Sequence, residues 1–191
     1  MSTHPKTLLT EEQYLEIERK AEYKSEYLHG EMFAMAGAVA AHNLLVANLL
    51  GILYVEIRSR NCRRYPSDMR VRVSKTGLYT YPDAIALCGE PQYLDEHEDT
   101  LLNPGLIVEV LSPSTEAYDR GRKFDHYKTI ASLQDYLLIS SDRVHVDLYS
   151  RQPDGRWLVA SADSPQESLE LQSVGCRLSL GELYANVGLA A

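Results

Sequence analysis

The chain has 191 residues, of which 45% are hydrophobic and 24% are charged. This length is enough to bury a core and falls within the range of one globular domain, so we expect residues 1–191 to form a single domain. The formal net charge of -8 at pH 7 excludes indiscriminate coating of nucleic acid, because non-specific affinity comes from Lys and Arg that neutralise phosphates. Any contact with nucleic acid must be local.

Two groups of basic residues could provide such a local contact. One group comprises Arg58, Arg60, Arg63 and Arg64, and the other comprises Arg120, Arg122, Lys123 and Lys128. Clusters of this kind are more often solvated faces than binding surfaces. The sequence leaves both explanations open.

The N-terminus and the cysteines predict a soluble, cytoplasmic protein without a membrane partner. No apolar run follows Lys6, and no stretch approaches the ~20 apolar residues needed to cross a bilayer. Cys62, Cys88 and Cys176 match neither a disulfide framework nor a zinc ribbon. We therefore expect buried free thiols in a reducing compartment.

The N-terminal part of the chain predicts two helices and a hairpin. A capping-box pattern that starts at Thr10 predicts a short helix to about residue 21. Loose alternation around His29 predicts a hairpin over residues 23–36. Leucines at helical spacing predict the longest helix over residues 40–58.

Short strands are expected next, at residues 62–66, 69–74 and 84–89. Arg70 and Arg72 alternate with apolar residues in the second strand, which predicts one solvent-facing side. The acidic run at 95–99 lacks periodicity and predicts an exposed loop.

The second half of the chain predicts a buried strand followed by a helix and further strands. The sequence LIVEV at 106–110 is almost continuously apolar, as in a strand that is buried on both faces. We expect a helix at 116–130, strands at 136–140, 144–150, 157–161 and 169–171, and a closing helix after Ser179 in which Glu182 completes a capping box.

Glu109 is the conspicuous residue of the buried strand. An ionised carboxylate there is costly unless it is paired or bound to a cation. Asp83 lies just before strand 84–89, and pairing of the two strands could bring both carboxylates to a common point. Two carboxylates with room for water and a phosphate suit Mg²⁺, which could polarise a phosphodiester and help to generate hydroxide.

The helix expected at 116–130 places Asp119, Lys123 and Tyr127 on one face, at i, i+4 and i+8. One explanation is an exposed Asp119–Lys123 ion pair worth only about 0.3 to 0.5 kcal/mol. The other is that the strand and loop aim this helix at Glu109, so that Lys123 serves the site. Both hold if Asp119 orients Lys123.

Three motifs together resemble the Uma-two family of endonucleases, a large bacterial family expanded in cyanobacteria. These motifs are YPD at 81–83, VEVLSPST at 108–115 and DRGRKFDHY at 119–127. The resemblance runs from about Thr10 to Tyr149 and includes Gly30-Glu31 and Ala41-His42. It implies an α/β, restriction-endonuclease-like, or PD-(D/E)XK, fold with a central mixed β-sheet flanked by helices.

By this resemblance Asp83 and Glu109 are metal ligands for Mg²⁺ or Mn²⁺, and the Val110 carbonyl is a candidate third ligand. The substrate implied is nucleic acid, with DNA expected, and its phosphodiester bonds are hydrolysed. The chain departs from the wider motif at Leu111, where a lysine is usual. Within the family a lysine on the following helix looks like a substitute, and Lys123 is the matching residue here.

Several other residues are candidates for supporting roles. Glu31 and His42 also match family positions. Glu31 could add a carboxylate to the metal site or only cap a turn, and we favour the role at the metal. His42 could hydrogen-bond that site, act in proton transfer or only cap the long helix, and we favour the structural role. Asp68 could approach the same cluster or only form a turn. Ser112, Ser114 and Thr115 are expected to cap the helix, since no G-x-S-x-G elbow is present.

Three functions fit these features. The leading one is a metal-dependent endonuclease in which Lys123 stabilises charge. The second is a catalytically silent module for DNA binding or dimerisation, which Leu111 and the acidic net charge favour. The third is a metal-dependent hydrolase of another phosphoester. A homodimer is expected by analogy, with strands 144–150 and 157–161 as candidate edges.

Overall fold

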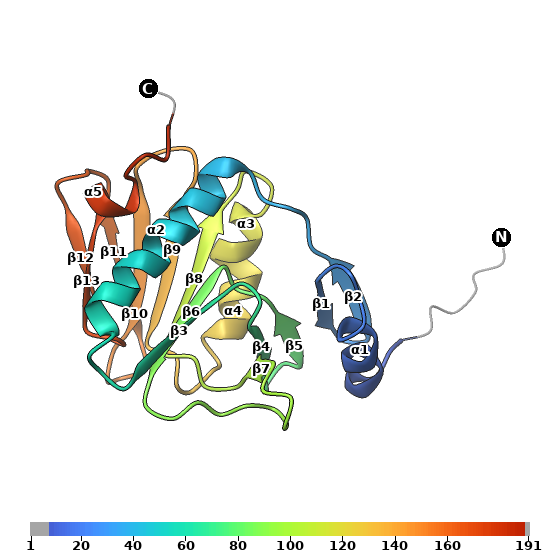
Figure 1. Ribbon diagram of the computed structural model, residues 1–191. Helices are drawn as coiled ribbons and strands as arrows, with labels where there is room; N and C mark the ends of the chain where they lie inside the picture. The colour runs from blue at the N-terminus through green and yellow to red at the C-terminus, as the bar shows by residue number, and fades with distance from the viewer. Residues whose placement is uncertain (1–7, 190–191) are drawn as a thin grey trace.

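The computed structural model describes residues 8–189, which build a central mixed β-sheet flanked by helices, as predicted (Figure 1). Its strand order is β11-β10-β9-β8-β6-β3. Only β8 and β9 are parallel, and the other neighbours are antiparallel. The strands are β3 (Cys62–Pro66), β6 (Ala84–Cys88), β8 (Leu106–Leu111), β9 (Asp135–Ser140), β10 (Val146–Arg151) and β11 (Trp157–Ala162). The observation that no apolar run follows Lys6 concerns in part residues 1–7, which lie outside the described residues.

Strand β8 is buried along its whole length, as its apolar sequence predicts. Leu106, Val108 and Val110 face one hydrophobic core, whereas Ile107 and Leu111 face a second core on the other side of the sheet. The alternation of a strand therefore puts Glu109 on the side of the second core.

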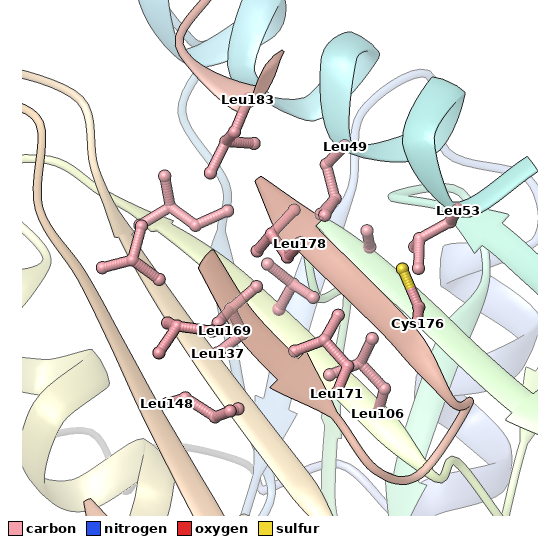
Figure 2. Close-up of a cluster of buried hydrophobic side chains, with 14 of the residues drawn as sticks. Leu49, Leu53, Leu106, Leu137, Leu148, Leu169, Leu171, Cys176, Leu178 and Leu183 are labelled. Atoms are coloured by element: carbon pink, nitrogen blue, oxygen red, sulfur yellow. The ribbon is translucent and has the colours of Figure 1, made fainter. Parts of the chain in front are cut away.

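The first core lies under the long helix α2 (Ala40–Ile57). Figure 2 shows leucines of this helix meeting those of the sheet and of a small C-terminal hairpin. The hairpin and the closing helix are β12 (Ser168–Leu171), β13 (Cys176–Ser179) and α5 (Leu180–Leu183). These elements cover the face of the sheet opposite Glu109.

Helix α2 is also long and apolar enough to cross a membrane by length and composition alone, with a mean hydropathy of 1.5 over 18 residues. The sequence analysis did not expect such a stretch. Its inner side, with Leu45, Leu49 and Leu53, is fully buried in the core. Core packing accounts for that part of its apolar composition.

The second core lies between the sheet, a helical segment and a second sheet. The helical segment consists of α3 (Glu116–Tyr118), the π-helical η1 (Asp119–Lys123) and α4 (Phe124–Tyr127). The second sheet has the order β2-β1-β5-β4-β7. Its strands are β1 (Ser25–Leu28), β2 (Glu31–Ala34), β4 (Arg70–Val73), β5 (Leu78–Thr80) and β7 (Thr100–Leu101).

Helix α1 (Glu11–Glu18) begins at Thr10 with both hydrogen bonds of the predicted capping box. The hairpin β1–β2 also forms as predicted, and its turn is built from His29 and Gly30 at φ values of 50° and 89°. Positive φ suits glycine at such a turn.

The prediction of a solvent-facing side on residues 69–74 is wrong at Arg70, which is only 2% exposed. Its guanidinium donates to Thr100 Oγ1 and to Tyr81 Oη, and pairs with Asp99 at 3.0 Å. The centres of the Tyr14 and Tyr81 rings each lie 5.7 Å from its Cζ atom. Helix α1 covers this face, which the alternation pattern could not reveal.

The prediction of three free thiols is wrong for two of them. Cys62 and Cys88 face each other in the β3–β6 register and form a disulfide. The third, Cys176, is a buried free thiol as predicted. Two cysteines far apart in sequence carry no signal of this pairing until the strand register is known.

Of the two strands expected as edges, only β11 is an edge of the central sheet, since β10 lies between β9 and β11; the opposite edge is β3. Leu158 and Val159 on this strand are 61% and 48% exposed. A homodimer that pairs through the sheet edge, as expected, would therefore use residues 157–162 and not residues 146–151. The dimer itself stays a prediction.

The buried Arg70 generates a prediction about stability. Arg70→Met should lower the free energy of unfolding by about 3 kcal/mol, because buried polar partners then lose their donor. Arg72→Met on the same strand should cost about 1 kcal/mol or less, since its partner Glu11 is 34% exposed and can be rehydrated. Urea unfolding of both variants measures this difference; equal losses would contradict the burial of Arg70.

Candidate metal centre

The pairing of β6 with β8 brings Asp83 beside Glu109. Ala84 is aligned with Val108 in this antiparallel pair, so the next residues outward are the two acids. Asp83 Oδ2 accepts a hydrogen bond of 2.7 Å from the Val110 backbone N–H, which fixes the carboxylate against β8. The two candidate ligands thus lie on adjacent strands at one end of the pairing.

Glu109 is 4% exposed and its Oε1 accepts hydrogen bonds from two side chains. Tyr127 Oη donates at 2.8 Å, and Lys123 Nζ lies at 2.9 Å. Burial raises the pKa of Glu109 well above its usual range, and the negative charges of Asp119 and Asp83 raise it further against the opposing effect of Lys123. The buried carboxylate therefore has the cationic partner that its position requires.

Lys123 is buried among three carboxylates. Besides Glu109, its Nζ lies 3.4 Å from Glu26 Oε1 and 3.5 Å from Asp119 Oδ1. Burial alone would lower the pKa of Lys123, but these acids more than offset that effect and raise the pKa well above its usual range. The side chain carries a positive charge, and the alternative of an exposed Asp119–Lys123 pair does not hold.

A π-helical turn directs Lys123 toward the sheet. Residues 119–123 form η1 between two short α-helical pieces. A π turn holds more residues than an α turn, which reduces the angular drift along a helix face. Asp119, Lys123 and Tyr127 are accordingly all buried on the side that faces the sheet. The Asp119 carbonyl accepts a 3.0 Å bond from Tyr136 Oη of β9, which anchors the turn.

Glu26 is a site residue that the sequence analysis missed. It lies on β1, where its Oε1 accepts a hydrogen bond from the Thr80 hydroxyl as well as contacting Lys123. Burial alternates along β1, with Ser25 and Tyr27 buried and Glu26 between them. That alternation places Glu26 on the opposite face, although nothing in the sequence indicates that Lys123 lies there.

His42 joins the site from the first turn of α2. Its Nε2 lies 3.0 Å from Asp83 Oδ1. The hydrogen bond to Asp83 raises the pKa of His42 against the effect of burial, and the backbone of Val110 raises it further. The histidine therefore contacts one candidate ligand directly, a position that the sequence analysis weighed as structural.

Glu31 and Asp68 are placed differently from the core of the site. Glu31 is aligned with Leu28 across the hairpin. Because Leu28 lies two residues after Glu26 on β1, Glu31 shares a face with Glu26. Asp68 is 81% exposed and forms an ion pair with Lys24, so the structure does not bring it to the carboxylates. Thr115 is the residue that precedes α3, as expected of a cap, but its side chain makes no capping bond to that helix.

Members of the first basic group form hydrogen bonds within the fold. Arg60 donates to the carbonyls of Val174 and Gly175, and Arg64 donates to the carbonyl of Leu50. In the second group Arg120 bridges Glu116 and Asp147, and Lys128 pairs with Asp125. Arg122 is the exposed member that makes no ion pair with any residue between 8 and 189.

The charge balance of the site fits a bound dication. Glu26, Glu109 and Asp119 surround one lysine, and Asp83 lies beside Glu109 on the paired strand. Burial together with mutual repulsion raises the pKa of Asp119 as well as that of Glu109. No group of three or more His, Cys, Asp or Glu within residues 8–189 is arranged as a ready metal cage. Mg²⁺ does not need one, because it binds through one or two carboxylates and keeps several waters.

Comparisons with known proteins agree with this fold. A family model described as "Uma2: Putative restriction endonuclease" matches residues 11–181. The uncharacterized protein sll1609 of Synechocystis sp. is 38% identical over 163 residues, 85% of this chain and 92% of that protein. The uncharacterized protein slr1290 of the same organism is 37% identical, over 92% of this chain and 91% of that protein.

A solved structure shares the fold. It is a crystal structure from Anabaena variabilis described as a "putative nuclease belonging to DUF820", with a TM-score of 0.75 and 18% sequence identity. The match covers 92% of this chain and 97% of that chain. The predicted restriction-endonuclease-like fold and the resemblance that the three motifs carry are both confirmed.

The contact between Lys123 and Glu109 generates a prediction that needs no activity. Lys123→Met should lower the free energy of unfolding by about 3 to 5 kcal/mol, because Glu109 is left buried without its cation. The double variant with Glu109→Gln should recover much of that loss. Urea unfolding in the presence of a chelator measures both, and losses that simply add would argue against the contact.

Proposed function

This chain belongs to the Uma2 family, whose model carries the description "Putative restriction endonuclease", and from that premise we propose that it is a metal-dependent endonuclease acting on DNA. The observation that carries the proposal is a lysine ammonium 2.9 Å from a buried strand carboxylate, with a second carboxylate on the adjacent strand. These are the charges that phosphodiester hydrolysis needs at one point.

In this proposal Asp83 and Glu109 hold Mg²⁺ or Mn²⁺, with the Val110 carbonyl as a candidate third ligand. A bound dication would supply Lewis-acid polarisation of the phosphate and a more acidic water. The protein's own contribution is to hold the two carboxylates on neighbouring strands. The Val110 N–H and His42 each bond one oxygen of Asp83, so they act as positioning residues for that ligand.

Lys123 supplies fixed positive charge for the developing negative charge of the phosphate. Its ammonium is held by Glu109, Glu26 and Asp119, so it needs no reorganisation as the charge develops. Leu111, at the usual lysine position of the motif, is packed in the second core. Since Glu109 and Leu111 share a face, a lysine from the covering helix reaches the same side of the strand.

The catalytically silent alternative rests on that same leucine. Leu111 leaves the strand without its usual cation, and a chain that had lost cleavage could keep the fold and the carboxylates. The closeness of Lys123 to Glu109 favours the active enzyme. Metal binding without cleavage of any substrate would favour the silent module.

The nuclease proposal predicts cleavage that depends on metal and on Glu109. Supercoiled plasmid and single-stranded DNA should be cut in Mg²⁺ or Mn²⁺, and a chelator or Glu109→Gln should abolish the cutting. Lys123→Met should slow it by about 10²- to 10³-fold, the usual effect of removing one charge-stabilising group. Gel electrophoresis of the products against time gives the rates.

Lys75→Met is the matched control, because Lys75 lies in the exposed turn between β4 and β5 and its loss changes the net charge equally. It should cut at the wild-type rate. Circular dichroism confirms that each variant is folded before its rate is compared. Cleavage that survives Glu109→Gln would contradict the proposed role of Glu109. Calorimetry that detects no Mn²⁺ binding would contradict the proposed metal dependence.

A further inference from the structure

A cavity of about 350 Å³ lies between the hairpin β1–β2 and the helical segment α3–α4. Figure 1 shows this hairpin on the side of the molecule that carries α3 and α4. The lining residues that matter here are Glu26, Leu28, Phe33, Tyr118, Arg122 and His126. None of the sequence motifs assigned a role to this space.

The cavity adjoins the candidate metal centre. Glu26 belongs to both, since it lines the cavity and its Oε1 lies 3.4 Å from Lys123 Nζ. The ring of Tyr118 also lines the cavity, with Lys123 Nζ 6.0 Å from its centre. A group held in the cavity would therefore lie beside the charges proposed to act on a phosphate.

The walls combine aromatic rings with a free cation. Phe33 is 50% exposed although it is a large apolar residue, and Tyr118 presents a second ring. Arg122 is exposed and makes no ion pair within the described residues. Aromatic rings bind nucleobases by stacking, and a guanidinium binds phosphate.

His126 adds a ring with unused hydrogen-bonding capacity. Burial lowers the pKa of His126, and the neighbouring His29 lowers it further. Its Nδ1 is buried without a hydrogen-bond partner among the described residues. Buried polar atoms are usually paired, so a polar partner from a bound molecule would complete this wall.

The size of the cavity limits what it can hold. A volume of about 350 Å³ corresponds to roughly twelve waters at the liquid volume of about 30 Å³ each. That space suits one base with its sugar, whereas a stacked and paired base in a duplex cannot present its face to Phe33 and Tyr118.

We propose that this cavity receives one unpaired nucleobase of the substrate strand, stacked on Phe33 and Tyr118, with Arg122 on a neighbouring phosphate. This inference rests on the proposed nuclease function and deepens it by naming the substrate class. The enzyme then selects DNA with single-stranded or flipped-out nucleotides over continuous duplex.

The test measures binding without cleavage. Wild-type protein in chelator is titrated into a labelled single-stranded oligonucleotide and into the blunt duplex of the same sequence, and fluorescence anisotropy follows binding. The single strand should bind at least tenfold more tightly. Phe33→Ala should weaken single-strand binding at least fivefold, as loss of one stacking platform does, and should leave duplex binding unchanged.

Tyr54→Ala is the control, because Tyr54 is a similarly exposed aromatic, at 48%, on α2 and does not line the cavity. It should bind like the wild type. Arg122→Ala should weaken single-strand binding and flatten its dependence on salt. A 2-aminopurine placed in the oligonucleotide should be quenched on binding to the wild type and not to Phe33→Ala, a readout that reports stacking directly.

Equal affinity for single strand and duplex, or single-strand binding that is unchanged in Phe33→Ala, would overturn the inference. The outcome is separable from that of the nuclease proposal. Single-strand binding that depends on Phe33, without any cleavage, would support base binding in the cavity and contradict nuclease activity. Cleavage in Mg²⁺ that prefers duplex and is unchanged in Phe33→Ala would support nuclease activity and overturn base binding in the cavity.

Discussion

The contact between Glu109 and Lys123 is the constraint on which the site depends. Glu109 lies in a strand that is buried along its whole length, where an unpaired carboxylate would be costly. The strand itself carries no cation, so the charge must come from another element. The helical segment supplies it, and its π turn keeps Asp119, Lys123 and Tyr127 directed at the sheet. The π turn thus places a positive charge next to the buried carboxylate of Glu109.

Because the lysine lies on a helix, strand β8 can keep an apolar residue at position 111. Leu111 can pack with the second core, so β8 remains apolar beyond Glu109. The ammonium meanwhile contacts acids from the central sheet, the helix and the hairpin. One buried cation thus joins three parts of the chain, and the surplus of carboxylates around it leaves negative charge that a dication can neutralise.

The sequence predicts the parts of the site that local pattern controls. Asp83 and Glu109 were found because an acid interrupts an apolar strand and another precedes its neighbour, and the motifs add Lys123. Glu26 was missed, as were the burial of Arg70 and the Cys62–Cys88 disulfide, because each depends on contacts between segments far apart in sequence. The strands β5 and β7 have only three and two residues, too few for periodicity to show.

The hairpin β1–β2 connects the candidate metal centre with the cavity proposed to receive a base. Its two strands align Glu26 with Phe33, so that one face carries an acid that touches Lys123 beside a ring that lines the cavity. A shift of β1 by one residue would turn Glu26 to the opposite face, where Tyr27 packs with Tyr14 and Tyr79. The aromatic cluster under the hairpin therefore holds the register that sets the spacing between the cavity and the charged site. Stability on one face of the hairpin and the proposed recognition on the other are fixed by the same strand pairing.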